Sequence, residues 1–138
     1  MIRNAERRDA EVLARLIGQL GYEASPGDVT DRLTLLEAEG RAILVAERDG
    51  AVVGCLTTSS MRVLHRPAPV GRISMMVVEE ALRGQGIGAA LVRAAEERLA
   101  AQGCYMVEVT SNLKRTEAHR FYEKLGYERT SVRLAKGL

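Results

Sequence analysis

The chain has few of the residues that build disulfide scaffolds or stack on nucleic acid bases. It contains two cysteines, Cys55 and Cys104, no tryptophan and one phenylalanine. Two cysteines are too few for a disulfide scaffold or a four-ligand zinc site, so we expect free thiols in a reducing, cytoplasmic compartment. The 20 basic residues are interspersed among 18 acidic ones, which gives no one-sided basic surface. We therefore expect no nucleic-acid partner.

Long apolar runs are also missing. No apolar stretch approaches the roughly 20 residues that span a bilayer, and the N-terminal segment, rich in arginine and glutamate, has no signal-peptide pattern. We expect no membrane association. At 138 residues, the chain is long enough for one hydrophobic core and too short for two. The sequence therefore predicts one domain over residues 1–138, without internal repeats.

The spacing of apolar residues predicts an α/β (α+β) chain. A spacing near 3.6 indicates helices, and β-branched or continuous apolar runs indicate strands. The expected elements are helices at 9–21 and 25–40, strands at 42–47, 51–58 and 72–78, a helix at 88–101, a strand at 104–109, a helix at 117–125, and one or two closing strands within 127–136. Asp9 is expected to cap the first helix. This order predicts three layers, with helices on both faces of a mixed sheet.

Three glycines at alternate positions precede the helix at 88–101, in the segment Leu82-Arg83-Gly84-Gln85-Gly86-Ile87-Gly88. The first N–H groups of a helix lack backbone partners and lie at the positive end of its dipole. Residues without side chains let a phosphate approach these groups. A tight turn alone would need fewer glycines, so the segment predicts a ligand that carries phosphate.

Two kinds of phosphate ligand are compatible with this segment. Gly84–Ala89 matches the dinucleotide pattern G-x-G-x-x-G/A, and Glu108 lies near the place of a ribose-binding acid. In that fold the first glycine follows its strand almost directly, whereas Glu79–Arg83 intervene here. The chain after Gly88 is also too short to complete a doubly wound sheet. The residues therefore disfavour a dinucleotide.

A second segment fits a different ligand. Arg83-x-x-Gly86-x-Gly88, followed by an alanine-rich helix, resembles the pyrophosphate-binding signature of the GNAT superfamily of acyl-CoA-dependent N-acetyltransferases. The segment 112–127 (NLKRTEAHRFYEKLGY) resembles the second signature of that family, which ends in Tyr-x-x-x-Gly-Tyr/Phe, and is similar to its aminoalkylphosphonate N-acetyltransferase branch. The resemblance covers essentially the whole chain. It implies a three-layer αβα sandwich with a largely antiparallel, splayed central sheet.

The resemblance also implies acetyl-CoA as co-substrate. Backbone groups of Met76, Val77 and Val78 would pair with the pantetheine arm, beside the splay of the sheet. Main-chain N–H groups of the glycine segment would hold the pyrophosphate. The further coenzyme contacts that the resemblance implies are Arg83, Gly84, Gln85, Gly86, Ile87, Gly88, Ala89, Asn112 and Arg115.

The implied reaction is direct attack of a neutral amine on the thioester. A bulge near Val78 would aim its N–H at the developing oxyanion. Tyr122 matches the family's proton donor to the thiolate, and a tyrosine of pKa about 10 facing a thiolate of about 8.5 gives a proton for roughly 2 kcal/mol. Glu108, with Glu79 as second choice, would take the proton from the amine.

The acceptor amine stays open at this point. Cations in the segment Arg62–Pro67, together with Arg72, would suit a small amine that also carries phosphonate or carboxylate. A peptide or protein amine is an alternative acceptor, and a non-catalytic module that holds acyl-CoA is an alternative function. His65 and His119 are too separated to suggest a metal site. The resemblance further implies a homodimer.

Overall fold

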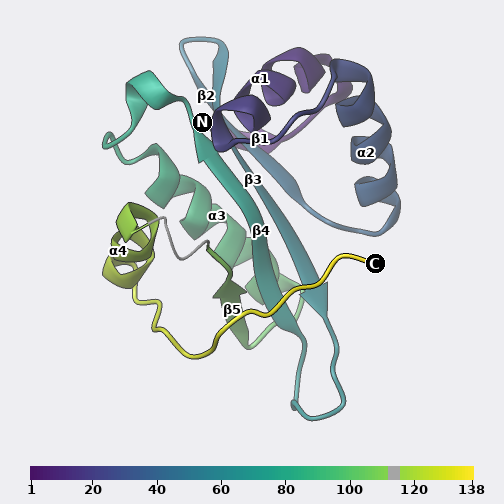
Figure 1. Ribbon diagram of the computed structural model, residues 1–138, viewed down its shortest axis with the longest axis vertical. Coiled ribbons are helices and arrows are strands. Elements are labelled where there is room, and N and C mark those ends of the chain that lie inside the picture. The colour runs from purple at the N-terminus through teal and green to yellow at the C-terminus, as the bar shows by residue number, and fades with distance from the viewer. Residues whose placement is uncertain (112–115) are drawn as a thin grey trace.

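Five strands form one sheet with helices on both faces in a computed structural model that describes residues 1–111 and 116–138 (Figure 1). The sheet contains β1 (Ile2–Asn4), β2 (Ile43–Arg48), β3 (Ala51–Met61), β4 (Val70–Val78) and β5 (Met106–Val109), in sequence order. The first four strands are antiparallel, and β5 runs parallel to β4. The predicted mixed, largely antiparallel sheet is confirmed.

Two helices cover each face of the sheet. One pair is α1 (Ala10–Leu20) and α2 (Pro26–Ala38), and the other is α3 (Ile87–Ala101) and α4 (Thr116–Lys124) (Figure 1). Short 3-10 turns, η1 (Arg7–Asp9) and η2 (Glu80–Leu82), precede α1 and α3. Apolar side chains between α1, α2 and the sheet form one core cluster, and those between α3, α4 and the sheet form a second. The expected three layers are therefore present.

Both α1 and α2 begin where the sequence predicts, but only α2 has the expected side-chain cap. The Ser25 hydroxyl accepts a hydrogen bond from the Asp28 N–H, and the Asp28 carboxylate accepts one from the Ser25 N–H, each at 3.0 Å. Asp9, by contrast, gives no side-chain cap to α1. Its buried carboxylate accepts two hydrogen bonds from Arg3, at 2.8 and 2.9 Å, and one from the Glu6 N–H at 2.7 Å. The predicted cap was wrong because this carboxylate joins β1 to η1.

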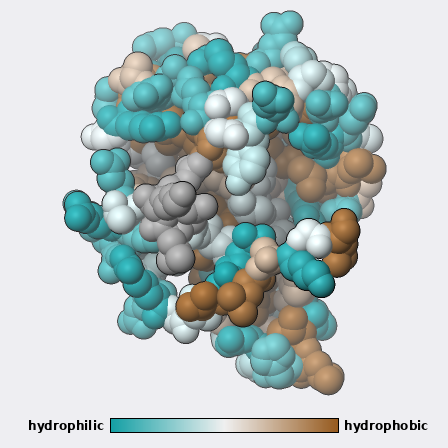
Figure 2. Space-filling model, in the orientation of Figure 1, coloured by the Kyte–Doolittle hydropathy of each residue, from teal (hydrophilic) through white to brown (hydrophobic). Residues whose placement is uncertain are grey.

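The C-terminal segment differs from its prediction. Residues 128–138 form no strand, and Val132 and Leu134 are 77% and 91% exposed. Apolar side chains also remain uncovered at the end of the β3–β4 hairpin, including Leu64 (Figure 2). Two alternating apolar residues do not provide the buried face that stabilises a strand. The prediction of closing strands within 127–136 was therefore wrong.

Among the described residues, no helix is long and apolar enough to cross a membrane.

Candidate active site

Strands β4 and β5 separate halfway along β4. Val70–Ile73 pairs with β5, and within the described chain no strand lies against residues 74–78 on that side. Ser74 is an extra residue in the ladder with β3, since Thr57 pairs with Met75 while Thr58 pairs with Ile73. Such a bulge bends its strand. The splay is present as expected, but the bulge lies at Ser74, because the β3–β4 ladder keeps its register from Met75 to Val78.

The backbone of β4 presents polar groups to this gap. The Glu79 N–H donates to the Val53 carbonyl at 2.8 Å, and hydrogen-bonded pairs alternate along an antiparallel ladder. Val77 therefore bonds to β3, whereas Met76 and Val78 turn their backbone groups toward the gap. Of the three residues predicted to hold the pantetheine arm, only these two present their main chain there.

The N-terminus of α3 has the form of an anion site. Gly84 and Gly86 have φ of +82° and +83°, a conformation that costs a residue with a side chain about 1–2 kcal/mol. The helix makes its first hydrogen bond from the Ala90 N–H to the Gly86 carbonyl, at 3.1 Å. Among residues 1–111 and 116–138, no side chain caps the helix, and its first turn has no acidic residue. The N–H groups of Ile87–Ala89 are therefore available to a phosphate.

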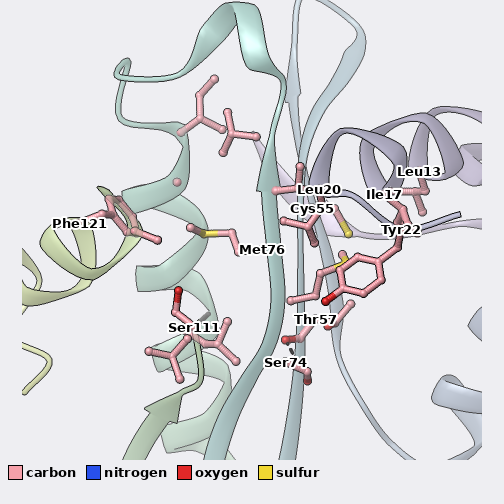
Figure 3. Close-up of a pocket in the computed structure, with 18 of the residues that line it drawn as sticks. Leu13, Ile17, Leu20, Tyr22, Cys55, Thr57, Ser74, Met76, Ser111 and Phe121 are labelled. Carbon is pink, nitrogen blue, oxygen red and sulfur yellow. Dashed lines mark hydrogen bonds between the residues drawn. The ribbon is translucent and has the colours of Figure 1, made fainter. Parts of the chain in front are cut away.

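The third glycine of the motif has a different role. A Cβ at Gly88 would lie 3.2 Å from Cζ of Phe121 and 3.5 Å from Cε of Met76. Figure 3 shows these two side chains turned toward each other across the cavity that flanks β4. Gly88 thus lets α4 pack closely against α3, whereas Gly84 and Gly86 shape the loop.

Side chains of the glycine loop attach it to neighbouring strands. Nε of Arg83 donates to the Val78 carbonyl at 3.2 Å. The Gln85 side-chain oxygen accepts a hydrogen bond from Arg48, at the end of β2. Arg83 therefore occupies the Val78 carbonyl and leaves the Val78 N–H directed toward the gap.

Tyr122 lies at the same end of the cavity. It is 8% exposed, and its ring packs edge-on against Phe121 and Tyr127, with centroids 5.1 and 5.7 Å apart. Burial raises the pKa of Tyr122 to about 12. Against a thiolate of ordinary pKa, about 8.5, full proton transfer then costs roughly 5 kcal/mol instead of 2. The Tyr122 hydroxyl is accordingly better suited to donate a hydrogen bond to a thiolate than to protonate it completely.

The two carboxylates predicted as general base are both held by arginine side chains. Oε1 of Glu108 accepts hydrogen bonds from Nε and Nη2 of Arg72, at 2.9 and 2.6 Å. Oε2 of Glu79 accepts hydrogen bonds from Arg15 at 2.7 Å and Gln19 at 3.1 Å. The Arg15 guanidinium lowers the pKa of Glu79, which makes it a weaker base. Neither carboxylate lines the cavity described next.

An open cavity of about 1310 Å³ reaches both faces of the sheet beside β4 (Figure 3). On the α3 and α4 side it is lined by the glycine loop, Ser111 and Tyr122. On the α1 and α2 side its walls are mainly apolar, with Glu23 and Arg32 as ionisable groups at the edge. Neither Glu23 nor Arg32 was predicted from the sequence as a site residue. Arg32 could have been found, because it falls at helical spacing between the inward-facing Val29 and Leu36.

Several residues predicted for the site lie elsewhere. The segment Arg62–Pro67 belongs to the hairpin end that projects from the sheet (Figure 1), and neither it nor Arg72 lines the cavity. Asn112 and Arg115 lie outside the described residues. No group of three or more histidine, cysteine, aspartate or glutamate side chains among the described residues could hold a metal ion.

Comparison with known proteins agrees with this arrangement. A model of the Acetyltransferase (GNAT) family matches residues 8–127. An aminoalkylphosphonate N-acetyltransferase of Salmonella typhimurium is 38% identical over 94 residues, which span 68% of this chain and 61% of that relative. An aminoglycoside N(6')-acetyltransferase type 1 of Stenotrophomonas maltophilia is 30% identical over 137 residues, or 94% of this chain and 86% of that protein.

A solved structure extends the similarity to the fold. The crystal structure of glucosamine-6-phosphate N-acetyltransferase from Arabidopsis thaliana superimposes with a TM-score of 0.88. Its sequence is 25% identical, and the alignment covers 99% of this chain and 97% of the other.

Proposed function

Because the chain belongs to the GNAT acetyltransferase family, we propose that it transfers the acetyl group of acetyl-CoA to a primary amine of a small molecule. One observation carries the proposal: the cavity beside β4 combines the gap in the sheet with the uncapped start of α3. A thioester in the gap and a pyrophosphate at the helix belong to the same coenzyme. Acetyl-CoA carries both groups, so it fits the gap in the sheet and the start of α3 together.

The glycine loop would hold the pyrophosphate. Its anionic oxygens accept hydrogen bonds from the N–H groups of Ile87–Ala89, where the positive end of the α3 dipole favours negative charge. Gly84 and Gly86 keep side chains away from this approach, and Arg83 and Gln85 fix the loop to its neighbours. The backbone of Met76 would pair with an amide group of the pantetheine arm, and the Val78 N–H would face the thioester, because Arg83 already occupies the Val78 carbonyl.

The chemical step forms a C–N bond and breaks a C–S bond. The amine nitrogen attacks the thioester carbon, and the Val78 N–H stabilises the oxyanion that develops on the carbonyl oxygen. The Tyr122 hydroxyl donates a hydrogen bond to the sulfur as the thiolate leaves. The amine loses one proton overall. The assignment of that proton to Glu108 stays a prediction, and the ion pair with Arg72 outside the cavity argues against direct transfer.

A small acceptor is supported by the names of the relatives. These proteins are named for aminoalkylphosphonate, aminoglycoside and glucosamine 6-phosphate, which are all small amines. Acetylation of a peptide amine is the competing outcome of the assay below.

The assay is release of free thiol from acetyl-CoA with a panel of small amines and a lysine-containing peptide. We expect turnover with small amines and a loss of kcat of about tenfold or more in Tyr122→Phe. Tyr105→Phe is the matched control, since the Tyr105 hydroxyl bonds to Arg66 outside the cavity. Equal and negligible rates in wild type and Tyr122→Phe, with coenzyme binding intact, would support a non-catalytic acyl-CoA-binding module.

The same variant gives a pH test. With a pKa of about 12, Tyr122 stays protonated at neutral and mildly alkaline pH. We expect no alkaline fall in kcat from this residue below about pH 11. A fall near pH 9 that disappears in Tyr122→Phe would contradict the assigned environment.

We also propose a cytoplasmic homodimer. The dimer is supported by the uncovered apolar residues Val132 and Leu134 and by the open outer edge of β5 in the described sheet. Light scattering coupled to size exclusion should give twice the chain mass. A monomer at micromolar concentration would contradict this part of the proposal.

A further inference from the structure

The cavity has one positively charged side chain on its α1 and α2 side. Among the described residues that line it there, Arg32 of α2 is the only arginine or lysine. The half-buried apolar side chains of Ile17, Leu20, Leu36 and Met75 lie on the same side. An acceptor entering from this side therefore meets a mainly apolar wall, one guanidinium and the Glu23 carboxylate.

The Arg32 guanidinium is available to a ligand. Within the part of the chain that the structure describes, it makes no hydrogen bond or ion pair, and the charged group that interacts with it electrostatically is the Asp28 carboxylate, one turn earlier. The Asp28 carboxylate already accepts a hydrogen bond from the Ser25 N–H in the capping box of α2. Asp28 thus serves the helix start and leaves Arg32 without a bidentate partner.

Three arginines that do not line the cavity are engaged in other contacts. Arg15 pairs with Glu79, and Arg72 pairs with Glu108. Arg66 donates to the Tyr105 hydroxyl at 2.9 Å. A guanidinium pairs with carboxylate or phosphate oxygens through two parallel hydrogen bonds, and on this side of the cavity only Arg32 has that capacity unused among the described residues.

We infer that Arg32 selects an acceptor that carries an anionic group in addition to its amine, on a short hydrocarbon frame. The inference rests on the proposed function and adds the residue that recognises the anionic group of the acceptor. The anionic group binds the guanidinium at the edge of the cavity, the hydrocarbon lies on the apolar wall, and the amine points toward the gap beside β4. Glu23, on the same side, would instead favour a polycationic amine, which makes that class the competing outcome.

The experiment compares acceptors that differ only in the acidic group. 3-Aminopropylphosphonate is paired with propylamine, and β-alanine with its amide, and KM and kcat are measured for wild type and Arg32→Ala. We expect Arg32→Ala to raise KM for the two acids about 10- to 100-fold, the effect of losing a charged hydrogen-bonding pair. KM for the neutral amines and for acetyl-CoA should stay within about twofold, and Arg32→Lys should recover part of the loss. Arg66→Ala, outside the cavity, should change neither class.

Failure of this inference can be told apart from failure of the proposed function. An enzyme that acetylates neutral or polycationic amines and not the acids would overturn the role of Arg32 and leave acetyl transfer standing. An equal change for acids and neutral amines in Arg32→Ala would do the same. No thiol release with any amine would overturn both. Calorimetric binding of 3-aminopropylphosphonate to the coenzyme A-saturated protein should be lost in Arg32→Ala, and unchanged binding would also overturn the inference.

Discussion

Replacement of Gly86 by alanine isolates the part that the loop before α3 plays in coenzyme binding. Gly86 has φ of +83°, and none of the described residues lies within 4 Å of the Cβ that alanine would add. The cost is therefore conformational and not steric. A left-handed conformation costs an L-residue about 1–2 kcal/mol, which for a chain of this size lowers Tm by about 3–7 °C.

Relief of that strain should also misalign the N–H groups at the start of α3. Loss of one hydrogen bond to a charged phosphate costs about 1.5–3 kcal/mol, so we expect KM for acetyl-CoA to rise about 10- to 100-fold in Gly86→Ala. The matched control is Gly103→Ala, because Gly103 has φ of +91° and equally open surroundings beyond the other end of α3. Thermal melts and steady-state kinetics measure both effects in the same two variants.

The control decides the interpretation. Gly103→Ala should lose the same stability and keep the wild-type KM for acetyl-CoA. If Gly86→Ala behaves in the same way, the conformation of the loop does not matter for coenzyme binding, and the role assigned to it is refuted.

Three further predictions concern the fold and the base. Asp9→Asn should lower the free energy of unfolding by about 2–3 kcal/mol, because Arg3 loses its buried partner. Arg3 lowers the pKa of Asp9 below its ordinary 3.8, so this contribution is present above about pH 4 and lost as pH falls through the folded pKa; urea melts of the two proteins should converge in acid. Gly71→Ala places a Cβ 2.8 Å from Leu99 Cδ1 and should cost about 1–3 kcal/mol by thermal melt, and an unchanged Tm would contradict the packing. Glu108→Gln should keep kcat within about threefold, whereas loss of a direct base would lower it about 10²- to 10⁴-fold.

Local sequence patterns predicted most of the fold. The strands expected at 42–47 and 51–58 are present as β2 and β3, and the Asp49-Gly50 pair between them has the positive φ values that suit a two-residue hairpin turn. The cap expected of Asp9 failed because Arg3, in β1, binds that carboxylate. The closing strands failed because alternation alone does not supply a partner or a buried face.

The two halves of the site differ in how far sequence could predict them. The glycine loop is a local motif, and its backbone geometry follows from residues next to one another. The pairing of Glu108 with Arg72 depends on the register between β4 and β5, which no local pattern contains. Helical spacing places Arg32 on the inner face of α2, but that this face borders the cavity depends on how α2 packs on the sheet.

The most direct test of acetyl transfer measures both products of one reaction. Purified protein is mixed with acetyl-CoA and a small amine, and free coenzyme A and acetylated amine are quantified together by mass spectrometry. The account predicts that the two appear in equal amounts and that both fall together in Tyr122→Phe. Stoichiometric binding of acetyl-CoA without acetylated amine from any member of the panel would contradict it.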